Sequence, residues 1–214
     1  MDRQPSIIRN ALALTAVNLL MRLVSIAFHA WLSGRIAAAG LGLVQLVMSA
    51  GSLAITLGLG GARVGAMYLA AESFGRGDRD ALRRVMTGCA LHALCVSALC
   101  ACALFFLSPA LSVRMNAGVP CTGALRLLAL TLPVTCLNLV LSGYFTASGQ
   151  LRTLVAVNAL DRLTSLALTF LLLARPGLSS ARACEAIVLG GGVSDLLATA
   201  VMIEPNSMSL SSIS

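Results

Sequence analysis

Residues Ala11–Leu32 read ALALTAVNLLMRLVSIAFHAWL, a long and largely apolar run with an arginine, Arg22, at its centre. As a helix the run is long enough to cross a bilayer, because about 20 residues at 1.5 Å each span the roughly 30 Å hydrocarbon core. A charged side chain at that depth costs on the order of 3 kcal/mol. We therefore expect a membrane helix whose Arg22 faces either a polar cavity inside a helix bundle or a structural partner on another helix.

The composition of the whole chain is that of an integral membrane protein. Hydrophobic residues make up 58% of the 214 residues and charged residues only 11%, with a mean hydropathy of +0.91. Soluble domains carry about 25% charged residues. The formal net charge of +7 comes from fifteen arginines and no lysine. Because no basic stripe with interleaved aromatic residues is present, this excess favours contact with anionic lipid headgroups over contact with nucleic acid.

Five further apolar segments have the length of a membrane span, and turn-forming residues separate them. Long runs without strand-like alternation favour helices, which satisfy their own backbone in lipid. The second segment is expected to continue past the glycine cluster Gly58–Gly61, because residues 64–71 stay apolar. The chain is therefore predicted to be an all-α bundle of six transmembrane helices within residues 1–203, followed by a disordered polar tail over 204–214. The six segments are Ala11–Leu32, Leu41–Leu59, Val85–Leu107, Leu125–Tyr144, Leu154–Ala174 and Ala183–Ile203.

The arginines predict the orientation, since positively charged loops stay on the cytoplasmic side. If the N-terminus lies inside, the inner segments hold seven arginines and the outer ones five, which is a weak bias. The dense group at Arg76, Arg79, Arg83 and Arg84 weighs more, because it is concentrated in one short stretch. The sequence thus predicts a multi-pass protein of the cell membrane with both termini in the cytoplasm.

No catalytic or metal-binding pattern is recognisable in the sequence. The two histidines, His29 and His92, lie in different spans without Cys, Asp or Glu at ligand spacing. There is no Walker loop, G-x-S-x-G or H-E-x-x-H. The seven cysteines form no C-x-x-C and are interpreted as small buried apolar residues. We expect no enzyme activity, no cofactor and no metal.

Polar residues at membrane depth are the candidates for a substrate pathway. An asparagine and an arginine four residues apart share one face of the first helix, and a second such pair repeats the spacing in the fifth. Aspartates lie in the fifth and sixth helices. This set could form a structural charge network, or a cationic cavity wall that binds a phosphate- or carboxylate-bearing substrate while the aspartates tune it or carry protons. The candidate residues are Asn18, Arg22, Asn158, Asp161, Arg162 and Asp195.

Glycines and a proline mark the expected packing or hinge positions. Gly61 and Gly65 form a small-xxx-small pair suited to close helix contact. Pro133 removes a backbone hydrogen bond in mid-span and is expected to kink the fourth helix. Gly191 lies in a run of three glycines just before Asp195, which indicates close packing or a flexible break near the cavity.

A series of short motifs along the chain carries a family resemblance. They are Arg22, Gly40-Leu-Gly-Leu, Leu57-Gly-Leu-Gly-Gly, Ala71-Glu-Ser-Phe-Gly-Arg-Gly-Asp, Ser142-Gly-Tyr-Phe-Thr-Ala-Ser-Gly-Gln, Asp161-Arg162 and Gly191-Gly-Val-Ser-Asp195. In order and spacing they resemble the multidrug/oligosaccharidyl-lipid/polysaccharide exporter superfamily. Within it the chain looks most like the polysaccharide flippase and stage V sporulation protein B branch. The resemblance runs from about Asn10 to Ile203.

The resemblance implies a flippase for a lipid-linked oligosaccharide or cell-wall precursor that works by alternating access between two helical lobes. Arg22 is similar to the superfamily's intramembrane arginine in the first helix, and Arg162 to a recurrent arginine in the fifth. Asn158 stands where a Glu is frequent, and Asp195 where Gly-Glu is common. The chain resembles the N-terminal lobe alone, so it is expected to be a truncated half or to pair with a second chain.

Two other functions stay open from the sequence. A lobe of a multidrug/cation antiporter would be expected to carry acids in this cavity, whereas the first span offers Arg22. A non-transporting membrane fragment or assembly subunit is the third possibility. The expected partners are the lipid bilayer, an anionic lipid-linked saccharide and a second lobe or second copy of the chain, and nucleic acid is not among them.

Overall fold

The computed structural model describes residues 4–35, 38–115, 121–173 and 180–203, and the regular structure within these ranges is entirely α-helical. Six of the seven described helices, all except α3, are long and apolar enough to cross a membrane. The predicted all-α fold with six spans is confirmed, while the polar tail at 204–214 lies outside the described residues. The helices are α1 (Gln4–Arg35), α2 (Ala38–Leu59), α3 (Ala62–Arg76), α4 (Arg79–Met115), α5 (Thr122–Ala147), α6 (Leu151–Leu173) and α7 (Ser180–Ile203).

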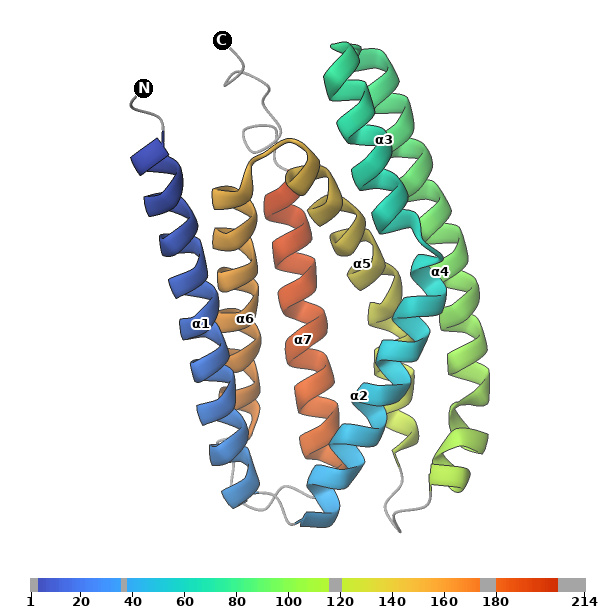
Figure 1. The fold of residues 1–214 in the computed structure, drawn as a ribbon. Coiled ribbons are helices and arrows are strands. Elements are labelled where there is room, and N and C mark those ends of the chain that lie inside the picture. The colour runs from blue at the N-terminus through green and yellow to red at the C-terminus, as the bar shows by residue number, and fades with distance from the viewer. Residues whose placement is uncertain (1–3, 36–37, 116–120, 174–179, 204–214) are drawn as a thin grey trace.

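The second predicted span does not continue as one helix but breaks into α2 and α3. Gly60 and Gly61 have φ angles of 49° and 82°. These left-handed values interrupt an α-helix and favour glycine, which has no Cβ to clash. The break lies beside the middle of α4. A Cβ at Gly58, two residues before the break, would lie 3.3 Å from the Cα of Ser97, which is near the midpoint of that helix. α2 and α3 together run alongside α4 as one discontinuous helix (Figure 1).

Helix α5 forms the centre of the bundle. It contacts α2, α3, α4, α6 and α7, and its buried side chains Leu125, Leu132, Val140 and Phe145 are at most 1% exposed. Pro133 lies inside α5, which continues through it as a single helix. Helix α1 is attached differently, since it packs chiefly against α6 at the edge of the bundle (Figure 1).

Within the described part of the chain, Gly61 and Gly65 make no close helix contact, so their predicted packing role stays a prediction. A Cβ at either position would meet no heavy atom within 4 Å. The close approach to α3 is made instead by Gly143 of α5, where a Cβ would lie 3.0 Å from the Arg63 carbonyl oxygen. The spacing of small residues in the sequence identified α3 as a helix that packs closely on a neighbour. It did not identify Gly143 of α5, where the two backbones approach each other.

The three-glycine run of α7 packs closely on both sides at Gly190 and Gly192, while the packing or hinge role of Gly191 stays a prediction. A Cβ at Gly192 would collide with Thr131 of α5. A Cβ at Gly190 would lie 2.6 Å from Thr169 Oγ1 of α6. At Gly191, between them, a Cβ would meet nothing within 4 Å among the described residues. The glycines therefore let α7 approach two neighbours at once.

The ends of the helices divide between two faces of the bundle. α1 begins and α7 ends at the same face as the α3–α4 turn and the α5–α6 turn (Figure 1). α1 ends and α2 begins at the opposite face. The start of α1 and the end of α7 therefore lie at the face that also carries the Arg76–Arg84 group.

We expect the face that carries the α3–α4 turn to be cytoplasmic. In a cysteine-free background, Gly75→Cys should react with a membrane-impermeant maleimide only after the membrane is permeabilised. Arg114→Cys, near the other end of α4, should react in intact cells, and both positions are exposed in the structure. The reverse labelling pattern would invert the topology.

Candidate functional site

A cavity of about 1380 Å³ opens between α1, α5, α6 and α7. All six polar residues predicted from the sequence as a substrate pathway line it, although they come from three helices. The geometry brings them together but does not test their role, which stays a prediction. They are Asn18 and Arg22 from α1, Asn158, Asp161 and Arg162 from α6, and Asp195 from α7.

Helix α1 contributes a polar stripe to the cavity. Asn18, Arg22, Ser25 and His29 recur every three or four residues and all line it. The Nδ1 atom of His29 lies 2.8 Å from the Ser25 carbonyl oxygen and can donate a hydrogen bond to it. Sequence reasoning treated His29 only as an unsuitable metal ligand and missed its place here. The signal was present, since His29 continues the spacing of Asn18 and Arg22.

Hydrogen bonds between α5 and α7 build the opposite wall. Thr135 Oγ1 donates to Asp195 Oδ2 at 2.5 Å, and Asn138 Nδ2 donates to the Asp195 carbonyl oxygen at 3.4 Å. Asn138 is 9% exposed and therefore has little access to water. Thr135 and Asn138 were missed from the sequence, because they lie about 60 residues from Asp195 in an otherwise apolar helix.

The charged groups of the cavity are not equally accessible. Arg22 and Arg162 are exposed, whereas Asp161 and Asp195 are half-buried. No ion pair in the described residues joins these arginines to these aspartates, and the one that is found lies on α3. The cationic groups are thus the ones that a molecule in the cavity would meet first.

Asp161 has an oxygen that the fold leaves without a partner. Its Oδ1 atom is buried and accepts no hydrogen bond from the described residues. Such groups are rare because an unpaired buried polar atom is costly. This oxygen could accept a hydrogen bond from a bound molecule. The described residues contain no group of three or more His, Cys, Asp or Glu side chains arranged to hold a metal ion.

Thr135→Val is expected to lower the free energy of unfolding by about 1–3 kcal/mol, because the half-buried Asp195 carboxylate loses its donor. Thr146→Val on the same helix is the matched control, since its hydroxyl donates to the Ser142 carbonyl one turn away. Unfolding of the purified protein by denaturing detergent measures both variants. Equal stability of the two would show that the Thr135–Asp195 bond does not hold α5 to α7.

Comparisons with known proteins agree with the helical architecture. The MatE family model matches residues 13–171. Among solved structures the chain is similar to a chain described as the outward-facing conformation of a multidrug resistance MATE family transporter of the MOP superfamily. That match has a TM-score of 0.64 and 21% identity, and covers 94% of this chain and 45% of the other. A search of curated protein sequences finds no match. The chain thus shares the fold of somewhat less than half of that transporter.

Proposed function

The chain belongs to the MatE family, and from this we propose that it forms one lobe of an alternating-access membrane transporter. The observation that carries the proposal is the polar cavity of about 1380 Å³ among helices that are otherwise apolar. Ionisable residues at membrane depth are expensive and mark substrate pathways. A second lobe or a second chain would close the open side of this cavity, as alternating access requires.

The substrate class that fits best is an anionic lipid-linked saccharide, such as a precursor of a cell-wall or other polysaccharide. The exposed guanidinium groups of Arg22 and Arg162 suit phosphate oxygens, which a planar fork of N–H donors binds in pairs. The amides of Asn18 and Asn158 line the same space and suit sugar hydroxyls. One carboxylate oxygen of Asp195 is already engaged by Thr135, so it competes less for the arginines.

The edge position of α1 supports a substrate that carries a lipid. α1 presents exposed apolar side chains beside its polar stripe, among them Leu19 and Leu23 at 60% and 56%. A headgroup could therefore contact the polar stripe while its hydrocarbon chain stays in the bilayer along α1. On this proposal the protein is a flippase of the polysaccharide and sporulation branch, located in the cell membrane with cytoplasmic termini.

A second candidate is a lobe of a multidrug/cation antiporter. The unpaired Asp161 Oδ1 in the cavity wall favours it, because a carboxylate oxygen accepts a hydrogen bond from an organic ammonium. The similar solved structure is described as a multidrug resistance transporter, which is consistent with this candidate. The two candidates differ in the charge of the ligand that the cavity should prefer.

Ligand binding to the purified chain in lipid nanodiscs separates the candidates. Three fluorescent probes are compared, namely a polyprenyl-diphosphate-linked saccharide, the same lipid saccharide without its diphosphate, and a cationic dye. The proposal expects the diphosphate probe to bind at least about tenfold more tightly than the neutral one, equivalent to about 1.4 kcal/mol. Preference for the cationic dye would favour the antiporter. Binding of none of the three would leave a fragment or assembly subunit.

A further inference from the structure

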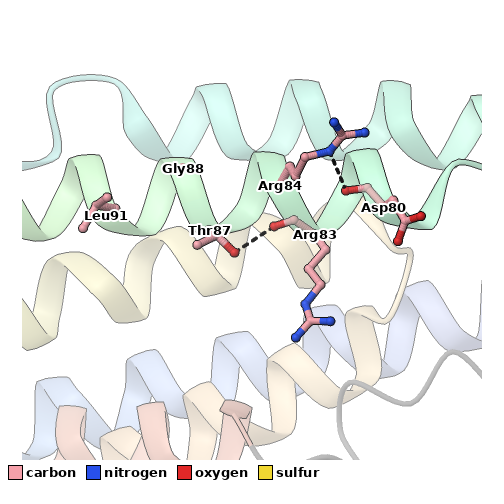
Figure 2. A pocket seen from close by; sticks show the side chains of 6 residues that line it. All are labelled: Asp80, Arg83, Arg84, Thr87, Gly88 and Leu91. Atoms are coloured by element: carbon pink, nitrogen blue, oxygen red, sulfur yellow. Dashed lines mark hydrogen bonds between the residues drawn. The ribbon is translucent and has the colours of Figure 1, made fainter.

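A second hollow, of about 510 Å³, lies on one face of α4 and shares no residue with the substrate cavity. Its lining residues recur at helical spacing and form a single stripe along α4 (Figure 2). The opposite face of α4 is the buried one, with Leu82, Ala93 and Ser97 at 6%, 0% and 0% exposure. The stripe therefore faces outward from the bundle. It consists of Asp80, Arg83, Arg84, Thr87, Gly88 and Leu91.

The hollow changes character along the helix axis. Its first part carries the guanidinium groups of Arg83 and Arg84 and the hydroxyl of Thr87, as Figure 2 shows. Its second part is formed by Gly88 and the apolar side chain of Leu91, which is 61% exposed. This part is open, because a Cβ at Gly88 would meet nothing within 4 Å. The stripe of eleven residue steps is about 16 Å long at 1.5 Å per residue. The polar part ends where the long apolar run of α4 begins.

The two arginines of the hollow are available to an anion. Both are exposed, and no ion pair in the described part of the chain engages either of them. Arg84 Nε donates to the Asp80 carbonyl oxygen at 3.3 Å, which leaves its terminal nitrogens uncommitted. Figure 2 shows Arg83 and Arg84 leaving α4 in different directions. Asp80 is the one acid in the lining, so the formal charge of the hollow is positive.

We propose that this hollow is a binding site for an anionic glycerophospholipid. The phosphate is bound by the guanidinium groups of Arg83 and Arg84, and an acyl chain lies along Gly88 and Leu91. Basic side chains at the end of a membrane helix attract anionic headgroups, and guanidinium groups bind phosphate through paired hydrogen bonds. The apolar half of the hollow is what selects a lipid over a free phosphate ion.

The test measures lipid binding to the purified full chain. Native mass spectrometry detects the bound lipid in titrations with phosphatidylglycerol or phosphatidylcholine. The wild-type chain should prefer phosphatidylglycerol. The double variant Arg83→Gln/Arg84→Gln should lose about thirtyfold in this preference, since one basic group near an anionic surface contributes about fivefold. Arg83→Lys/Arg84→Lys keeps the charge and should retain most of it. Equal binding of both lipids by the wild-type chain would overturn the proposal.

The matched control is Arg114→Gln/Arg182→Gln, which removes two exposed arginines near the opposite face of the bundle. It should keep the wild-type preference, and a loss equal to that of the first double variant would overturn the site. Gly88→Leu fills the apolar half and should weaken phosphatidylglycerol binding severalfold. Inorganic phosphate at millimolar concentration should not displace the lipid, and displacement would show a phosphate site and overturn the assignment to a lipid.

Discussion

Arg22→Ala is expected to weaken binding of the diphosphate-linked saccharide at least about thirtyfold, because removal of one charged partner at a desolvated contact costs roughly 2–5 kcal/mol. The fold should be unaffected. Arg22 is exposed in the cavity and no ion pair in the described residues depends on it. Arg22→Lys should recover binding only in part, since lysine keeps the charge but lacks the planar fork.

Arg63→Ala is the matched control for this prediction. Arg63 is also exposed, close to the deep break between α2 and α3, but it does not line the cavity. Its replacement should leave binding of the diphosphate probe near the wild-type value. Titration of the fluorescent probe in nanodiscs measures all three variants, and thermal unfolding checks that each is folded. Wild-type binding by Arg22→Ala, or an equal loss in Arg63→Ala, would remove Arg22 from the proposed site.

Gly192→Ala is expected to be less stable than Gly191→Ala by about 2 kcal/mol, the usual cost of forcing extra volume into a packed contact. Both changes add the same methyl group to neighbouring positions of α7, so the gain in helix propensity cancels between them. Only the Cβ at position 192 collides with Thr131 of α5. The β-branched Thr131 is restricted in χ1 and cannot readily turn aside.

The Gly192→Ala substitution should also disturb the candidate site. Thr131 and Thr135 lie one turn apart on α5, and Thr135 donates to Asp195 of α7. Widening the gap between the helices should therefore weaken both stability and ligand binding. Thr131→Ser removes the colliding methyl group and should restore most of the loss in Gly192→Ala. Denaturing-detergent titrations test this, and equal stability of the two alanine variants would refute close packing at Gly192.

The sequence could predict that polar residues of the site lie together only when those residues belong to the same helix. Asn18 and Arg22 share a face because four residues make about one helical turn, and the cavity confirms that they lie together. The same rule would have reached His29. It could not reach Thr135 or Asn138, because their relation to Asp195 crosses between helices that are distant in the chain.

Segment length and polarity were sufficient by themselves to establish the class of protein, since a bilayer of fixed thickness selects helices of matching apolar length. Six spans and the intramembrane arginines followed from them, whereas the exporter resemblance came from the order of short motifs along the chain. Tertiary structure alone decided that α2 and α3 separate at Gly60 and Gly61, and that α7 meets its neighbours at Gly190 and Gly192. The reason is physical. In lipid, helices associate through close packing and interhelical hydrogen bonds, and these depend on the direction in which each side chain points.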